Sequence, residues 1–229
     1  MRPTLLAAIL LVPLGPRAAA AQDVYDRAVF VITRGGAETG RIEFAIREAA
    51  GRNGRRGLLV AATTRTPAHE VQYAQELTDL IPTSFQQTET VGNRVMRRVS
   101  ATVIGVRFSA RASTPDGDVS RELPVRGAFV ILGDEDYTAY YFMPRPDSGQ
   151  SIPFTVIRTR DVSAVPASIA GLGGDMVTVA GRAIRCQHFA LTVTGEETRE
   201  FWITEGGSLV QVGLPTSGLT ARRAEAPGR

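Results

Sequence analysis

The segment from Thr198 to Arg223 reads TREFWITEGGSLVQVGLPTSGLTARR and shows the folding pattern of the chain most plainly. It holds three short runs rich in β-branched and aromatic residues, separated by the turn sequences Glu205-Gly206-Gly207 and Pro215-Thr216-Ser217-Gly218. Glycine reaches positive φ and proline presets φ at about −65°, so such clusters end one strand and begin the next. The segment therefore predicts an antiparallel meander with short hairpin loops.

The same pattern extends towards the N-terminus. Residues 40–47 alternate strictly, with Ile42, Phe44 and Ile46 on one face and mainly charged side chains on the other. This alternation is typical of a half-buried antiparallel strand. The other predicted strands are 24–33, 57–66, 85–91, 94–113, 119–132, 176–179 and 183–194.

Proline and glycine mark the interruptions of this pattern. Pro124 indicates an edge strand or a break, because proline cannot donate to a ladder. Residues 144–153 and 166–174 are rich in proline and glycine and are predicted to be connections. Residues 68–80 fit either a helix or a strand by their apolar spacing, and the β pattern that follows favours a strand.

The last strands are apolar on both faces. Phe201 and Ile203 project to one side of their strand, and Trp202 projects to the other. A strand covered on both faces belongs to a sheet that wraps around a helix, a second sheet or a ligand. The fold class that follows is mostly β: an antiparallel meander that forms a curved half-barrel or open barrel, with one short helix.

That short helix is predicted directly after Asp134-Glu135-Asp136, whose carboxylates suit a helix N-terminus. Tyr137, Tyr140 and Tyr141 follow at helical spacing, with Phe142 beside them. The cluster has two interpretations: it lines an apolar ligand cavity, or it attaches the helix to the sheet by packing.

The N-terminus has the order of a secretion signal. Arg2 precedes an apolar core, and the small residues Ala18 to Ala21 form a cleavage site. The apolar core is shorter than the about 20 residues that span a bilayer. We therefore expect a signal peptide at 1–21, a single β-rich domain at 22–223 and a flexible tail at 224–229. The protein is predicted to be periplasmic or secreted, with no stable membrane span.

Charge and composition exclude several classes of partner. The formal net charge is +3, and the densest basic stretch, residues 52–57, lies in a Gly/Asn turn. A nucleic-acid binder needs a concentrated basic face, so no nucleic-acid partner is expected. Cys186 is the sole cysteine, which rules out an intramolecular disulfide. Its position between apolar residues of one strand face predicts a buried, reduced and inert thiol.

No catalytic or metal-binding motif is evident. Cys186 and His188 share a predicted strand face, but a hydrolytic pair also needs an orienting group and an oxyanion hole. With one cysteine and two distant histidines, no metal site or cofactor is predicted. We therefore expect no enzyme, with hydrolysis of an envelope polymer as a distant alternative.

The residues 201–212, FWITEGGSLVQV, and the opening strands 24–33 and 40–47 resemble uncharacterised exported β-rich bacterial proteins. The architecture of that group resembles the half-barrel of the lipoprotein-sorting carriers, which encloses a helix and an apolar concave face. The carriers cover this face with lid helices, whereas only one short helix is predicted here.

The two apolar faces of the last strands and the expected export without an anchor favour a non-catalytic binding protein of the cell envelope. Such a protein would hold a lipid-like or other apolar ligand on a concave sheet. The alternative is a structural or protein-interaction module with a filled core and an envelope protein as its partner. The residues expected to bind the ligand are Tyr137, Tyr140, Tyr141, Phe142 and Trp202.

Overall fold

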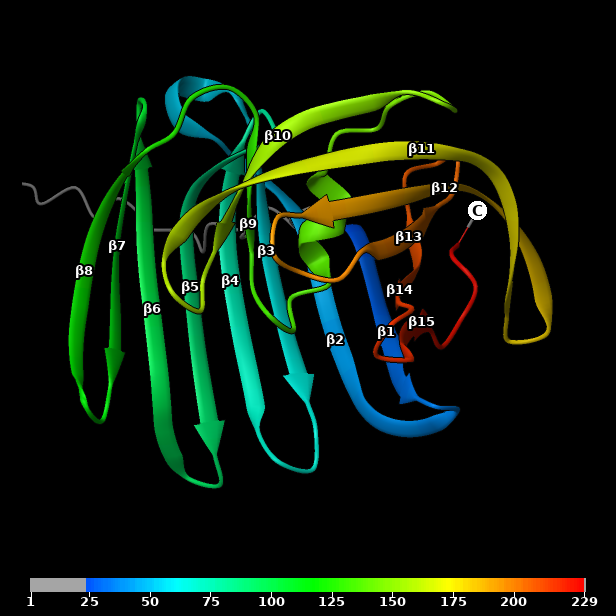
Figure 1. Cartoon of the computed structure of the whole chain (residues 1–229), viewed down its shortest axis with the longest axis horizontal. Helices are drawn as coiled ribbons and strands as arrows, with labels where there is room; N and C mark the ends of the chain where they lie inside the picture. The colour runs from blue at the N-terminus through cyan, green and yellow to red at the C-terminus, as the bar shows by residue number, and fades with distance from the viewer. Residues whose placement is uncertain (1–23, 229) are drawn as a thin grey trace, which may run out of the picture.

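A computed structural model describes residues 24–228, so the predicted signal peptide at 1–21 lies outside the described residues. These residues form fifteen strands and two short 3-10 helices (Figure 1). The strands are β1 (Val24–Arg34), β2 (Ala37–Ala50), β3 (Arg56–Arg65), β4 (Glu70–Thr78), β5 (Ile81–Val91), β6 (Arg94–Ile104), β7 (Arg107–Thr114), β8 (Gly117–Pro124), β9 (Phe129–Leu132), β10 (Ser151–Arg158), β11 (Ser163–Val179), β12 (Arg182–Val193), β13 (Arg199–Ile203), β14 (Leu209–Leu214) and β15 (Leu219–Arg223). The helices are η1 (Arg52–Gly54) and η2 (Thr138–Phe142).

All fifteen strands belong to one open sheet, in the order β8-β7-β6-β5-β4-β3-β2-β1-β15-β14-β13-β12-β11-β10-β9. Every pairing is antiparallel except β9 with β10. The first and last strands therefore lie side by side in the middle of the sheet, joined from Phe30↔Arg223 to Arg34↔Leu219. The sheet curls so that β10–β12 cross in front of the N-terminal strands, and β9 lies against β5 (Figure 1). The predicted open barrel of antiparallel strands is confirmed.

Three predicted boundaries are wrong, two of them because of glycine. The run 119–132 is divided into β8, which ends at Pro124, and β9, and these two strands form opposite edges of the sheet. The run 94–113 is two strands, since Gly105 at φ +60° turns the chain between β6 and β7. Residues 166–174 are not a connection but the middle of β11. There a Cβ on Gly171 would lie 2.4 Å from the carbonyl oxygen of Asp147. Glycine is therefore required here, because two backbone segments approach closely.

The ambiguous region 68–80 contains strand β4, as expected. Val71, Tyr73 and Leu77 face the interior and are buried. Ile81 begins β5, after a two-residue turn formed by Asp79 and Leu80. Its side chain is 54% exposed.

Two apolar clusters stabilise the sheet, one on each side of its C-terminal half. The main cluster fills the space enclosed by the curved sheet and includes Phe201 and Ile203, both fully buried. The smaller cluster lies on the other face, and its members are Val177, Val179, Cys186, Trp202 and Val210. The predicted two-faced burial of β13 is thereby confirmed. Among residues 24–228, no helix is long and apolar enough to cross a membrane.

Candidate functional site

The four clustered aromatics lie inside the curved sheet. Tyr137, Tyr140 and Tyr141 are at most 6% exposed, and Phe142 is partly buried against the same core. The Tyr140 ring packs on Phe201 at 5.3 Å between centroids. The Tyr141 ring meets Phe44 edge-on at 5.4 Å. Segment 133–143 therefore fills the interior as a plug of side chains.

A carboxylate fixes the start of this plug. Oδ1 of Asp136 accepts hydrogen bonds from the Thr138 backbone N–H at 2.9 Å and from the Thr138 hydroxyl at 2.5 Å. The expected cap at 134–136 is not formed: η2 is a single 3-10 turn whose N-cap is Tyr137, without a side-chain hydrogen bond, and Asp136 instead holds the turn that leads into it. Burial raises the pKa of Asp136 to about 6, and the bonds from Thr138 oppose that rise.

A buried polar group secures the other side of the plug, at the seam between β1 and β15. The Arg223 guanidinium donates to the Leu209 carbonyl at 2.6 Å, to the Tyr141 hydroxyl at 2.8 Å and to the Asp26 carboxylate. The Tyr141 hydroxyl also donates to Asp26. Burial raises the pKa of Tyr141, so the phenol stays protonated. Because Asp26 and Arg223 lie 197 positions apart, no local sequence pattern could have indicated this group.

Arginines also surround Glu196, whose carboxylate is only 9% exposed. Arg199 contacts it at 2.5 Å, Arg160 at 3.3 Å and Arg158 at 3.4 Å. Arg199 also donates to the Tyr140 hydroxyl at 3.4 Å, which links this ion cluster to the plug. Glu196 lies in the turn between β12 and β13, and this turn brings its carboxylate between three guanidinium groups.

Trp202 does not join the four aromatics. It lies on the opposite face of the sheet, where His188 stacks on it at 4.3 Å between centroids. The indole N–H donates to Asp175 at 2.8 Å. His188 Nε2 lies 3.3 Å from Oε2 of Glu200. The five residues expected to bind one ligand are therefore divided between the two faces of the sheet.

Cys186 lies beside this histidine and is 2% exposed, which confirms its predicted burial. Burial and then the nearby Asp175 charge raise the pKa of the thiol to about 11. The thiol is consequently protonated at neutral pH, and thiolate is the form that attacks or binds metal. Its S–H donates to the Ile184 carbonyl at 3.6 Å.

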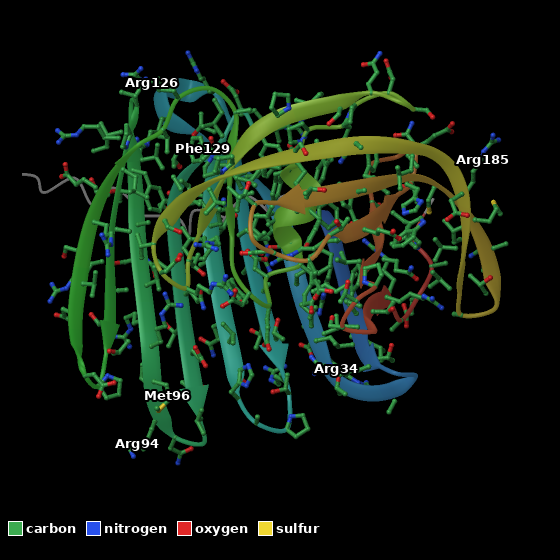
Figure 2. All side chains as sticks on the ribbon, in the orientation of Figure 1. Arg34, Arg94, Met96, Arg126, Phe129 and Arg185 are labelled. Carbon is green, nitrogen blue, oxygen red and sulfur yellow. The ribbon has the colours of Figure 1, made fainter. Side chains whose placement is uncertain are left out.

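Cys186 and His188 border a hollow of about 250 Å³ between the bend of β11 and the loop that precedes β10. Its lining is mainly polar: Arg145, Asp147, Ser148, Arg185 and Glu205. Figure 2 places Arg185 at the side of the molecule remote from β8. Across the described residues, no group of three or more His, Cys, Asp or Glu side chains could hold a metal ion.

Comparison with known proteins supports the architecture. No protein-family model matches the chain, and no curated protein matches it. A crystal structure of a beta-barrel-like protein of the domain of unknown function DUF1849 from Brucella abortus superposes with a TM-score of 0.54. The match covers 86% of this chain and 94% of that chain at 10% sequence identity. The likeness extends to the fold alone. It supports the expected similarity to uncharacterised β-rich proteins.

Proposed function

We propose that this protein is an exported, non-catalytic module of the cell envelope that binds a protein partner through its surface. The observation that carries the proposal is the filled interior. Tyr140, Tyr141 and the Asp26–Arg223 pair occupy the space that a carrier would keep for its ligand. A lipid-like ligand on the concave face would first have to displace this hydrogen-bonded plug.

The two edges of the described sheet differ sharply. β9 is buried at three of its four positions and lies against β5. β8 pairs with β7 on one side only, and seven of its eight residues are exposed. Alternate residues of an edge strand direct their backbone N–H and C=O groups away from the sheet. β8 therefore offers a free ladder to which an extended segment of a partner can add.

The charged side chains of β8 favour pairing with a specific partner strand over self-association. Its Asp118 and Glu122 pair with Arg111 and Arg107 of β7, so the charges neutralise one another across the strands. Charged side chains hinder self-association of exposed edges. A partner strand with its own complementary charges would still pair, which fits one specific protein better than aggregation.

Site-specific photo-crosslinking tests this proposal. A photoreactive residue at Ser120 in β8 should crosslink one envelope protein that also co-purifies in stoichiometric amount. Ser100 is the matched control, because it is exposed on the same sheet face and lies in the same row, two strands inward. Recovery of the uncrosslinked monomer alone would contradict the proposal. So would equal crosslinking from both positions.

A further inference from the structure

One end of the sheet exposes aliphatic side chains at neighbouring hairpin turns. Leu80 and Ile81 at the β4–β5 turn are 60% and 54% exposed, and Ile104 and Val106 at the β6–β7 turn are 70% and 60% exposed. The pairing of β5 with β6 brings both turns to the same end of the sheet (Figure 1). Exposed apolar side chains are common singly, but such a group at adjacent tips marks an interaction surface.

The backbone conformation of Leu80 is unfavourable for a leucine. The turn Asp79-Leu80 has φ values of +51° and +65°, where glycine or asparagine is strongly preferred. At the opposite end of the sheet the two-residue turn between β1 and β2 uses Gly35-Gly36 for positive φ. A bulky residue in this region is strained, and such strain is typical of functional positions.

Arginine surrounds these apolar tips. The Arg52 guanidinium donates to the Val103 carbonyl at 3.0 Å and to the Thr83 carbonyl at 3.4 Å, and so bridges the two hairpins. A hollow of about 410 Å³ lies there, lined by Arg52, Arg55 and Ile81. Figure 2 places Arg126 at the same end of the sheet.

The charges at this end leave an excess of positive charge. Arg55 pairs with Asp79 at 3.2 Å, Arg107 pairs with Glu122 at 2.5 Å, and Arg56 pairs with Glu48. Neither Arg52 nor Arg126 forms an ion pair within residues 24–228. Arg126, and the N–H groups of Arg52 that do not bond to Val103 and Thr83, are thus available to an external anion.

The geometry points to an anionic membrane surface as the occupant of this end, with the tips of Leu80, Ile81, Ile104 and Val106 inserted between headgroups and Arg52 on lipid phosphate. Aliphatic side chains surrounded by cationic ones suit the boundary between headgroups and acyl chains. Arginine binds phosphate in bidentate fashion. A protein interface of high affinity would favour buried aromatic anchors, and the four exposed side chains here are all aliphatic.

This inference goes beyond the proposed function, because it concerns the hairpin tips and not the β8 edge. Flotation with vesicles of phosphatidylglycerol and phosphatidylcholine in equal amounts tests it. The protein should float with these vesicles in low salt, bind much less in high salt, and not bind vesicles of phosphatidylcholine alone. Arg52→Gln should weaken binding about fivefold, from about 1 kcal/mol per basic residue.

The variant Leu80→Gly distinguishes a loss of vesicle binding from a loss of folding stability. It removes an inserting side chain and suits positive φ, so the melting temperature should stay constant or rise while vesicle binding falls about tenfold. Leu172→Ser is the matched control, since Leu172 is 49% exposed on β11, away from these turns, and its loss should leave binding unchanged. The inference is overturned if the unmodified protein does not bind anionic vesicles, or if Leu80→Gly binds them as well as Leu172→Ser does. Crosslinking of the tips to a protein would also overturn it, whatever the result at Ser120.

Discussion

At the scale of single residues, Arg223 has the largest expected effect on stability. Its side chain is 4% exposed and contacts Asp26, Tyr141 and the Leu209 carbonyl. Arg223→Gln would leave the buried Asp26 charge without its cationic partner, with only the Tyr141 hydroxyl still donating to it, and breaking such a buried pair costs about 3–5 kcal/mol. Urea denaturation should show this loss. Arg222→Gln is the control: Arg222 is exposed, and its replacement should change the free energy of unfolding by less than about 0.5 kcal/mol.

Cys186 provides a milder prediction at the same scale. The thiol is buried in the small cluster on the outer face, so Cys186→Ala should cost about 1 kcal/mol through a small cavity. A thiol reagent should modify the folded protein slowly, since the raised pKa of Cys186 leaves little thiolate at neutral pH. Unfolding in urea should make the modification fast and complete. Fast modification without urea would show that the burial is wrong.

Asp136 gives the stability a pH dependence. The ordinary pKa of an aspartate is 3.8, and the pKa of Asp136 in the fold is about 6. Between about pH 4 and about pH 6 the folded chain therefore binds this proton more tightly than the unfolded chain does. The protonated Asp136 therefore stabilises the fold fully below about pH 4. This stabilisation decreases as the pH rises and is gone above about pH 6, and the total change is on the order of 3 kcal/mol.

Asp136→Asn isolates this contribution, because an amide oxygen can still accept the two bonds from Thr138. The difference in unfolding free energy between the variant and the natural protein should grow in favour of the variant from pH 4 to pH 6. Parallel stability curves for the two proteins over this range would contradict the prediction.

At the scale of elements, the bend of β11 depends on Gly171. A Cβ there would lie 2.4 Å from the Asp147 oxygen and 2.7 Å from the Pro146 oxygen, and backbone atoms cannot move away cheaply. Gly171→Ala should therefore cost about 2 kcal/mol or more. Gly174→Ala, three residues later, meets nothing within 4 Å and should be close to neutral. Chemical denaturation of the two variants compares them directly.

The plug that contains η2 shows how elements combine in this fold. Segment 133–143 has too little helix to be stable alone. Its conformation depends on contacts from both halves of the sheet, through Phe44 on β2 and Phe201 on β13. Sequence therefore located its aromatic side chains, and the surrounding strands determined that they pack as core.

At the scale of the whole molecule, the seam between β1 and β15 joins the N-terminal and C-terminal halves of the sheet. Deletion of residues 215–229 would remove β15, expose the partner edge of β1 and remove Arg223. We expect this variant to lose cooperative thermal unfolding, measured by circular dichroism. Deletion of residues 225–229 keeps all of β15 and should leave a cooperative transition. A cooperative transition in the longer deletion would show that the halves fold separately.

The chain's own pattern of apolar alternation and turn residues was enough for the mostly β class, the meander and the burial of Cys186. Period-two alternation and positive-φ turn residues act locally, so they can be read without knowledge of contacts. They located β4 and the two-faced β13. They failed where glycine has a non-local purpose, as at Gly171, and they missed the local turn at Gly105.

Tertiary structure alone decided what the sites are. The Asp26–Tyr141–Arg223 group, the arginines around Glu196 and the separation of Trp202 from Tyr140 all depend on which distant strands become neighbours. The aliphatic tips at Leu80 and Ile104 likewise become one surface only when β5 pairs with β6. Pairing between remote strands is set by packing of the whole core, and no short stretch of sequence contains that information.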